Sequence, residues 1–367
     1  MQPQMNQEYH VIGLMSGTSL DGLDMAYCVF KHTHNKWTYT IEQAHTQPYP
    51  QKWVDTLKNL PLAPIVQFAE TDAALGRYMG SLVADFIVEH QIKPDFIASH
   101  GHTIFHQPEK GFTAQIGCGA AISAITGLPV INGFRNMDLA LGGHGAPLVP
   151  VGDLHLFPKE QACLNLGGIA NVSVYHSSEL TAFDICPCNM VLNRLAELTG
   201  CAYDADGKIA ASGNMEPELL ECLNQLPYYT VQGPKSLGIE WVDSQFWPLV
   251  SAFKHLTIPD KMATLVAHIG MQIGNTLDHA GVNKVLLSGG GTLNHFLIES
   301  IRSNTKAKLH IPDNLTIHFK EALIFAFLGV LRFRNETNVY KEVTGSTKSH
   351  VAGAIWGKFE QLRKKEQ

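Results

Sequence analysis

The chain has 367 residues, of which 45% are hydrophobic and 16% charged, with a formal net charge of −6 and a pI near 6.3. This length predicts two domains, and the balance of residues is typical of a globular protein with a sizeable core. The slight negative charge argues against nucleic acid as a partner.

The cysteines, the N-terminal residues and the longest apolar run indicate in which cellular compartment the protein acts. Seven cysteines, several inside apolar runs, favour reduced thiols over a disulfide framework. The polar residues 1–10 lack the apolar core of a secretion signal, and the longest apolar run, 322–331, is shorter than the roughly 20 residues that a membrane span requires. We therefore expect a cytoplasmic protein with no membrane partner.

Apolar periodicity predicts alternating strands and helices. Residues 9–30 predict a β-hairpin, and residues 37–44 a third strand. Farther along we expect strands at 95–99, 130–131, 182–184 and 284–288, and helices at 66–90, 119–126, 187–198, 256–280, 294–301, 320–334 and 352–365. Such alternation is typical of the α/β class.

The turn of the first hairpin is rich in glycines, hydroxyls and carboxylates. Its glycines allow backbone N–H groups to approach a phosphate, and Ser16, Thr18 and Ser19 add donors. Asp21 and Asp24 are candidates to hold Mg²⁺ directly or through water. No Gly-Lys-Ser/Thr follows, so this is not a Walker loop. Taken alone, the pattern fits an ordinary tight turn equally well.

The same pattern returns at residues 162–175, where Gly167 and Gly168 separate two apolar strands. Repetition after about 150 residues predicts two related domains, each beginning with a hairpin whose turn faces a shared cleft. A third loop, Gly289-Gly290-Gly291, lies between a strand and a helix and offers bare backbone and a helix N-terminus to a flat ligand or phosphate. Three such loops match the layout of the actin-like ATPase fold: two ribonuclease H-like domains that flank a nucleotide cleft.

Over nearly its whole length the chain resembles the anhydro-N-acetylmuramic acid kinase family, within the actin-like, sugar kinase and Hsp70 ATPase superfamily. The residues that carry the resemblance are 12–24, 99–103, 115–117, 134–135, 142–150, 165–171, 183–184, 234–236, 289–291 and 320–322. We expect an N-terminal domain at 1–135, a C-terminal domain at 136–349, and a C-terminal helix within 350–367 that packs on the first.

The resemblance implies an enzyme that uses ATP and Mg²⁺ to open the 1,6-anhydro ring of anhydro-N-acetylmuramic acid and to phosphorylate O6. The product is N-acetylmuramic acid 6-phosphate, and the reaction belongs to peptidoglycan recycling. The resemblance also implies a homodimer. Asp184 matches the carboxylate that deprotonates the attacking water. A carboxylate suits this step because the water attacks an oxocarbenium-like carbon, so a strong base is not needed.

The resemblance further implies how ATP and the sugar are held. The residues that hold the phosphates are Gly17, Thr18, Ser19, Leu20, Asp21, Gly22, Leu23, Asp24, Gly167 and Gly168, and Asp21 reaches Mg²⁺ through water. Gly289, Gly290 and Gly291 pack against adenosine. The sugar contacts are His102, Thr103, Arg135 and Glu321.

Two of these sugar contacts have alternatives. The planar fork of Arg135 suits the lactyl carboxylate of muramic acid, but a structural ion pair is an alternative. For Glu321 the alternative is an ordinary acid in the first turn of a helix.

The chain departs from the family pattern around the base and the sugar. The family's Asp-Thr-Gly-Pro-Gly-Asn reads Asp184-Ile185-Cys186-Pro187-Cys188-Asn189, and cysteine is strained where φ is positive. Other departures are Cys118, Gly133, His144, Asn193 and Ile239. They leave open a different 1,6-anhydrosugar such as levoglucosan, or an ATP-binding regulator with impaired turnover.

The cysteines also allow a metal site. Cys186 and Cys188, with Cys201 or with His100, His102 and His106, are candidate ligands of a soft ion. Cys-x-Cys spacing without a second matching pair is weak evidence for zinc. Buried thiols that pack the start of a helix are the simpler interpretation.

Overall fold

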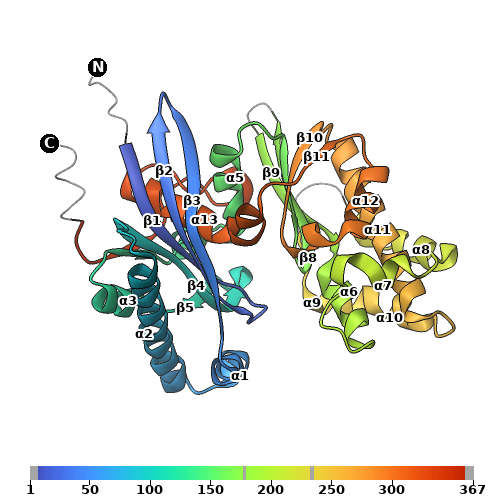
Figure 1. The fold of residues 1–367 in the computed structure, drawn as a ribbon, viewed down its shortest axis with the longest axis horizontal. Helices are drawn as coiled ribbons and strands as arrows, with labels where there is room; N and C mark the ends of the chain where they lie inside the picture. The colour runs from blue at the N-terminus through green and yellow to red at the C-terminus, as the bar shows by residue number, and fades with distance from the viewer. Residues whose placement is uncertain (1–6, 177–178, 232–234, 360–367) are drawn as a thin grey trace. The chain divides into compact units, whose positions relative to one another are not determined.

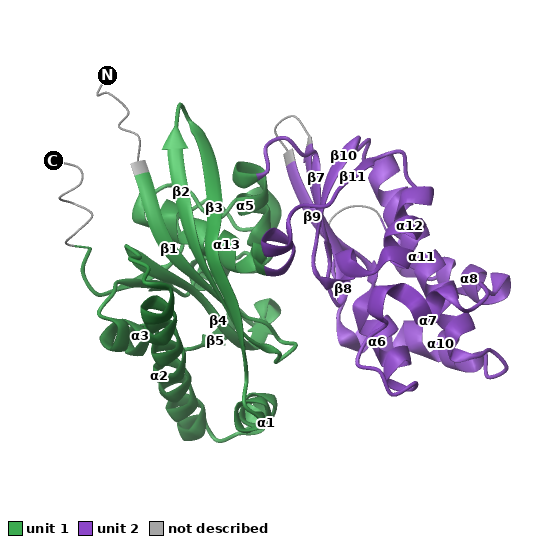
Figure 2. Cartoon of the chain, viewed as in Figure 1, with its two compact units in different colours: residues 1–156, 319–367 green, residues 157–318 purple. Residues whose placement is uncertain are grey.

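A computed structural model describes residues 7–176, 179–231 and 235–359 of the chain (Figure 1). Its contacts divide the chain into two units, residues 1–156 with 319–367, and residues 157–318 (Figure 2). The boundaries predicted from the sequence, 135/136 and 349/350, do not coincide with these, because residues 136–156 and 319–349 pack with the first unit.

The first unit contains a seven-stranded mixed sheet in the order β12-β6-β4-β1-β2-β3, with β5 paired to β4. Its strands are β1 Gln7–Ser16, β2 Gly22–Thr33, β3 Lys36–Pro48, β4 Phe96–Gln107, β5 Phe112–Ile116, β6 Val130–Asn132 and β12 Ala354–Trp356. Strands β1, β2 and β3 form an antiparallel meander, whereas β4 is parallel to both β1 and β6. Strand β4 continues beyond the predicted 95–99 because its second half pairs with β5.

The first unit also contains helices and short 3₁₀ turns. They are α1 Gln51–Asn59, α2 Ile65–His90, α3 Gly119–Thr126, α4 Asn136–Ala140, α5 Val149–Leu156, α14 Lys341–Thr344 and the part of α13 (Asn314–Phe333) from Phe319 onward, with 3₁₀ turns at Leu60–Leu62 and Pro108–Lys110. The predicted helices 66–90 and 119–126 are confirmed as α2 and α3.

The second unit contains a five-stranded sheet in the order β11-β10-β7-β8-β9. Its strands are β7 Ala162–Leu166, β8 Ile169–His176, β9 Glu179–Pro187, β10 Lys284–Ser288 and β11 Lys308–His310. As in the first unit, three strands form an antiparallel meander, and two more join parallel on the other side of the first strand. The shared strand order confirms two ribonuclease H-like units of the actin-like fold.

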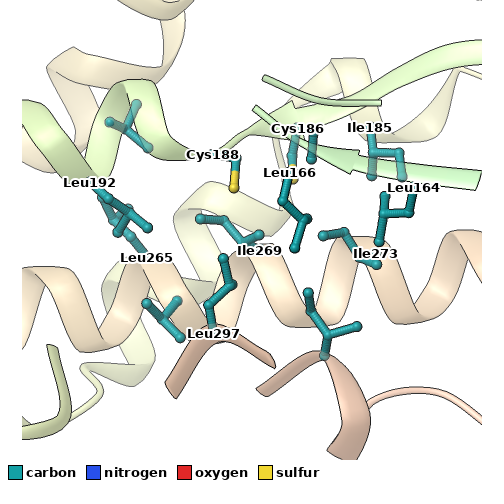
Figure 3. Packing of buried hydrophobic residues seen from close by; sticks show 14 of the residues in the cluster. Leu164, Leu166, Ile185, Cys186, Cys188, Leu192, Leu265, Ile269, Ile273 and Leu297 are labelled. Carbon is teal, nitrogen blue, oxygen red and sulfur yellow. The ribbon is translucent and has the colours of Figure 1, made fainter. Parts of the chain in front are cut away.

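Helices of the second unit are α6 Asn189–Glu197, α7 Lys208–Ala211, α8 Pro217–Asn224, α9 Ile239–Trp241, α10 Trp247–Ala252, α11 Ile258–His279 and α12 His295–Ser303. Short 3₁₀ or π turns lie at Ala205–Gly207, Pro227–Thr230, Val242–Phe246 and Gly290–Leu293. Helix α11 supplies much of the core, where Ile269 and Ile273 lie beside Leu164 and Leu166 of β7 (Figure 3). Its first turn is fixed by a capping box of Thr257 and Asp260.

The predicted C-terminal helix is wrong for the residues that the structure describes. Residues 354–356 form β12, which pairs antiparallel with β6. Gly353 and Gly357, on either side, both have positive φ, which a helix does not contain. The side chain of Trp356 donates to the amide oxygen of Asn132 at 2.9 Å. The rest of the expected helix, 360–367, lies outside the described residues.

Helix α13 is long and apolar and packs against the first sheet. By length and mean hydropathy, 1.4, it alone of the helices in the described part is apolar enough to cross a membrane, but 72% of that window is buried in the protein. Its backbone lies so close to β1 and β4 that Gly13 faces the carbonyl of Ala322, and Gly329 faces Ala98. Core packing therefore accounts for its composition. Its dihedral angles depart from helical values at Phe319, where the chain passes between units.

The contact between β1 and α13 gives a stability prediction. A Cβ added at Gly13 would overlap the backbone oxygen of Ala322, which no rotamer change can relieve. We expect Gly13→Ala to lower the free energy of unfolding by about 3 kcal/mol. The midpoint of thermal unfolding, followed by circular dichroism, measures this loss.

Gly168→Ala is the matched control, because a Cβ there meets its nearest neighbour, Met190, only at 3.8 Å. Equal unfolding midpoints for the two variants would contradict the close packing of α13 on β1.

Candidate functional site

The turn between β1 and β2 leaves backbone donors unpaired. The N–H groups of Gly17, Thr18 and Ser19 have no hydrogen-bond partner among the described residues, whereas the Leu20 N–H donates to the Gly17 carbonyl at 3.2 Å. Thr18 and Ser19 are exposed. Such a group of free N–H donors is a binding site for an anion such as a phosphate.

Two of the polar side chains in this turn are already engaged. Ser16 is 1% exposed, and its hydroxyl bonds to Tyr49 and His102, so it does not provide the phosphate donor expected from the sequence. Asp24 accepts a 2.5 Å hydrogen bond from Thr46. The carboxylate of Asp21 is exposed and has no side-chain partner within the described ranges. An open carboxylate beside free N–H donors fits a hydrated Mg²⁺ bound to phosphate.

The corresponding turn of the second unit, between β7 and β8, has the same property. Its carbonyls are engaged: Gly167 O accepts from the Asn189 N–H at 3.1 Å, and Gly168 O accepts from the N–H groups of Cys188 and Met190 at 2.9 and 3.0 Å. Its N–H groups, at Gly167 and Gly168, find no acceptor in the described structure. The start of α6 therefore holds this turn with its donors free.

The three glycines after β10 have different environments. A Cβ at Gly289 or Gly291 would overlap Asn165 or Leu166 at the end of β7, so these two glycines permit close packing. Gly290 faces open space, with no atom within 4 Å of a Cβ placed there. The expected helix N-terminus is not available as a donor group, because a 3₁₀ turn intervenes and Asn294 caps α12 through the Leu297 N–H.

Asp184 is a partly buried carboxylate on β9. Its Oδ2 accepts from the Leu237 N–H at 2.8 Å, and its backbone carbonyl accepts from the Tyr228 hydroxyl at 2.6 Å. Burial raises the pKa of Asp184 above its ordinary value, and the hydrogen bond from Leu237 partly offsets this rise. A carboxylate with a raised pKa is a better proton acceptor, which suits a general base.

A β-bulge directly after Asp184 decides where the unusual cysteines lie. Asn171 pairs with Asp184 and Ala170 with Cys186, so Ile185 is the extra residue and side-chain alternation is broken there. Cys186 and Cys188 are completely buried and point toward Ile269 of α11 (Figure 3). None of the residues 185–188 has a positive φ, so the strain that a cysteine suffers at positive φ does not arise at Cys186 or Cys188. The two thiols fill the core of the second unit.

Arg135 is held by a neutral histidine. His100 Nδ1 donates to the Gly101 carbonyl at 2.9 Å, which leaves His100 Nε2 to accept from Arg135 Nε and Nη2 at 3.1 and 2.9 Å. Burial, followed by the charge of Arg135, lowers the pKa of His100 well below its ordinary value. The structural ion pair considered for Arg135 is not formed with any described carboxylate; instead Arg135 Nη1 donates to the Gly145 carbonyl at 2.7 Å.

The loop that contains Gly145 is held by the buried carboxylate of Asp138. The carboxylate of Asp138, fully buried, accepts from the Gly145 N–H and from the Thr344 hydroxyl, each at 2.6 Å. Asp138 and Thr344 belong to α4 and α14, both beyond residue 135 in the chain. These hydrogen bonds join residues 138–145 to the segment after 319, and Arg135 connects the loop at Gly145 to His100 of β4.

The remaining sugar-contact candidates also lie in the first unit. Thr103 accepts from the Gln115 amide at 3.3 Å, and His102 bonds to Ser16. Glu321 is the second residue after the break in helical dihedral angles at Phe319, so it lies in the first turn of the helical segment that follows, and the alternative of a first-turn acid stays a prediction. Burial raises the pKa of Glu321, opposed by the charges of Lys320 and Arg135. Lys320 itself forms a buried ion pair with Asp153 at 3.0 Å.

The candidate residues fall into two groups. The first unit holds the 17–24 turn, His102, Thr103, Arg135 and Glu321, and the second holds Gly167, Gly168, Asp184 and Gly289–Gly291. Within the residues described, no three His, Cys, Asp or Glu side chains gather as a metal would require, and burial raises the pKa of the Cys186 and Cys188 thiols, of Cys188 to about 12.

The chain was compared with known proteins. A family model described as anhydro-N-acetylmuramic acid kinase matches residues 9–358. A relative of that name from Pseudomonas fluorescens is 32% identical, with 94% of this chain and 98% of the relative covered. Relatives of the same name from Shewanella denitrificans (33%, covering 95% and 98%) and a Sulfurovum species (32%, covering 96% and 100%) are equally similar. The chain belongs to the anhydro-N-acetylmuramic acid kinase family. It is therefore a sugar kinase.

Solved structures align less closely. The activator of the 2-hydroxyisocaproyl-CoA dehydratase from Clostridium difficile aligns over 89% of this chain and 97% of its own, with 12% identity and a TM-score of 0.43. A ROK hexokinase from Thermus thermophilus covers 88% and 99%, with 14% identity and a TM-score of 0.40. The fold assignment rests on the strand order of the two units.

Several residues that contact the candidate site residues were not predicted from the sequence. Tyr49, Tyr228 and Leu237 contact Ser16 or Asp184, and His100 holds Arg135. Of these, His100 lies in the Ser-His-Gly-His run at 99–102, and Leu237 lies in the block that contains residues 234–236 and Ile239. Tyr49, Tyr228 and Leu237 are separated from their partners by 33 to 53 residues, and no local pattern marks such pairs.

The open environment of Gly290 gives a binding prediction for the kinase. We expect Gly290→Leu to weaken ATP binding about fivefold or more, since steric overlap typically costs about 1–3 kcal/mol and each 1.4 kcal/mol is a factor of ten. Stability should stay unchanged, because nothing lies within 4 Å of the new side chain's Cβ. Calorimetric titration with a non-hydrolysable ATP analogue, together with thermal unfolding, measures both.

Gly291→Ala is the companion variant, because its Cβ would lie 2.8 Å from that of Leu166. It should lower the unfolding midpoint instead. Nucleotide affinity of Gly290→Leu equal to that of the wild type would show that Gly290 does not face the nucleotide.

Proposed function

We propose that this kinase uses ATP to open the 1,6-anhydro ring of anhydro-N-acetylmuramic acid and to phosphorylate O6, giving N-acetylmuramic acid 6-phosphate. The observation that carries the proposal is the pair of equivalent hairpin turns with unpaired N–H groups, combined with a carboxylate of raised pKa on β9. Family membership supports the choice of sugar. It also supports a cytoplasmic homodimer that acts in peptidoglycan recycling.

The turns supply donors to the phosphates of ATP. Gly17, Thr18 and Ser19 in one unit, and Gly167 and Gly168 in the other, offer backbone N–H groups that no described residue accepts from. The proposal assigns the neighbouring residues 20–24 to the same phosphate-binding turn. Preorganised N–H donors stabilise negative charge on a transferring phosphoryl group without reorganising during the reaction.

Mg²⁺ fits the donor set of the first turn. Asp21 would hold it through water, since its carboxylate is exposed and unengaged by the described side chains. Mg²⁺, when bound, neutralises charge on the phosphate oxygens. Gly290 would face adenosine, while Gly289 and Gly291 would shape the loop by packing on β7.

The reaction consumes one water, one anhydrosugar and one ATP. The water oxygen bonds to the anomeric carbon, and the bond from that carbon to the bridging O6 breaks. O6 bonds to the γ-phosphorus, the bond from γ-phosphorus to the ADP oxygen breaks, and ADP leaves. The proton of the attacking water passes to Asp184. Asp184 suits this step because burial raises its pKa while the Leu237 N–H holds Oδ2 in place.

The first unit supplies the sugar contacts. Arg135 is the carboxylate-binding candidate: it remains charged near pH 7, although burial lowers its pKa to about 10. Its hydrogen bonds to His100 and Gly145 use three of the five N–H donors of a guanidinium. The two others suit a lactyl carboxylate. His102, Thr103 and Glu321 are the proposed contacts to sugar oxygens.

The deciding experiment measures ATP consumption with Mg²⁺ on anhydro-N-acetylmuramic acid, levoglucosan and N-acetylmuramic acid. We expect turnover on the first sugar, and loss of about 10²–10⁴-fold in Asp184→Asn, because the amide still accepts from Leu237 but takes no proton. Affinity for ATP should stay unchanged in that variant, which serves as its control for folding.

Three other outcomes would change the proposed substrate, the proposed function or the proposed base. Turnover confined to levoglucosan would keep the chemistry and replace the sugar. ATP binding without dependence on any anhydrosugar would indicate a regulator built on the kinase fold. Full activity of Asp184→Asn would remove Asp184 as the base.

The raised pKa of Asp184 predicts the pH dependence of the reaction. Protonated Asp184 cannot accept the proton of water, so activity is lost as pH falls through its pKa in the folded enzyme. Because burial raises this pKa, the acid limb of kcat/KM for the sugar should lie above the ordinary aspartate value of 3.8. A pH profile at saturating ATP and Mg²⁺ measures the limb.

Enzyme exposed to each acidic pH and then assayed at neutral pH controls for acid inactivation. A profile that stays flat down to pH 3.8 would show that Asp184 is not the titrating base.

A further inference from the structure

The hydroxyl of Tyr49 begins a buried chain of hydrogen bonds that ends at His102. Tyr49 Oη lies 2.8 Å from Ser16 Oγ, which lies 3.0 Å from His102 Nδ1. The side chains come from the residue after β3, the end of β1 and the middle of β4, and all three residues are less than 8% exposed. The chain thus connects the start of the first glycine turn to a proposed sugar contact.

Chemistry fixes the direction of the first hydrogen bond. Burial raises the pKa of Tyr49 far above that of an ordinary phenol, so Tyr49 keeps its proton. In the described part of the chain, the only hydrogen-bond partner of the Tyr49 hydroxyl is Ser16 Oγ. A buried O–H left unpaired would cost about 1–3 kcal/mol. Tyr49 therefore donates to Ser16.

The direction of the second hydrogen bond follows. Ser16 has one hydroxyl hydrogen and is 1% exposed, and His102 Nδ1 is the only acceptor for that hydrogen among the described residues once Tyr49 donates. Ser16 therefore donates to His102 Nδ1, since a buried O–H left unpaired is costly. Burial lowers the pKa of His102 to about 4, so the ring is neutral near pH 7 and carries one hydrogen. Since Nδ1 accepts, that hydrogen is on Nε2.

Nε2 of His102 is available to a ligand. It has no hydrogen-bond partner among the residues described, and it is not one of the side-chain atoms that are both fully buried and unpartnered there, so solvent reaches it. His100, two residues earlier, has the opposite arrangement, with its hydrogen on Nδ1 and Nε2 accepting from Arg135. Of the two histidines in this motif, His102 thus presents an N–H donor at Nε2, whereas His100 presents an acceptor at Nε2.

We propose that Tyr49 is a positioning residue that acts through Ser16 to hold His102 as the Nε2–H tautomer, so that His102 donates to an acceptor oxygen of the sugar. The second half of this inference rests on the proposed function, whereas the tautomer does not. It also gives Ser16 a role other than phosphate binding.

The tautomer is measured on the whole protein labelled with ¹⁵N-histidine, by long-range ¹H–¹⁵N correlation without substrate. The His102 signals are assigned by their loss in His102→Gln. We expect wild-type His102 to show a protonated Nε2 and an unprotonated Nδ1. In Tyr49→Phe the Ser16 hydroxyl no longer has a donor, so both tautomers should appear and the two nitrogen shifts should move toward each other.

Kinetics test the consequence for the sugar. Loss of one oriented hydrogen bond should raise the KM for the anhydrosugar about three- to tenfold in Tyr49→Phe. The KM for ATP should stay unchanged, which separates the effect from distortion of the glycine turn. Tyr78→Phe is the matched control: its ring lies 6.3 Å from that of Tyr49, and its hydroxyl makes no hydrogen bond in the described structure.

Three results would overturn the proposal. They are a protonated Nδ1 on wild-type His102, a Tyr49→Phe variant with the tautomer and sugar KM of Tyr78→Phe, and an equal rise in the KM for ATP. A wild-type protein that turns over no anhydrosugar would refute the proposed function instead, and the tautomer measurement would still decide the role of Tyr49.

Discussion

A hairpin turn can offer its N–H groups to a phosphate only if its carbonyls are engaged elsewhere and the turn is held open. In the second unit the segment 184–190 meets this constraint. Its N–H groups at 188–190 bind the carbonyls of Gly167 and Gly168, and its first residue is the proposed base, Asp184. One short segment thus fixes both the proposed phosphate-binding turn and the proposed base. Its geometry matters more than the identity of its central side chains.

This constraint explains how the segment accommodates two cysteines where the family has glycines. The bulge at Ile185 lets Cys186 turn into the core together with Ile185, and no residue from 185 to 188 needs a positive φ. The thiols pack on α11, while the backbone keeps its hydrogen bonds to the glycine turn. In this chain the two thiols thus lie in the core of the second unit, and the carboxylate of Asp184 keeps its hydrogen bond from Leu237.

The sequence predicted the parts of the fold that depend on residues close together in the chain. Both hairpins and their repetition were visible because strand alternation and glycine turns are local features, and the structure confirms the shared strand order. The sequence predicted that the chain returns to the first unit only after residue 349, whereas it returns at residue 319. The earlier return was not predictable, because Gly13 against Ala322 and Asp138 with Thr344 are contacts between distant segments. Tyr49 and Tyr228 were missed for the same reason.

The charge balance around Arg135 bears on which sugar this kinase takes. Its guanidinium stays charged at neutral pH, and its described hydrogen-bond partners are a neutral imidazole and a carbonyl. The charge of Glu321 raises the pKa of Arg135, but no hydrogen bond or ion pair joins the two side chains within the described residues. A partly buried cation without a hydrogen-bonded anion favours a ligand that brings its own negative charge. Muramic acid has a carboxylate and levoglucosan does not, so the proposed contact of Arg135 with the substrate favours the acidic sugar.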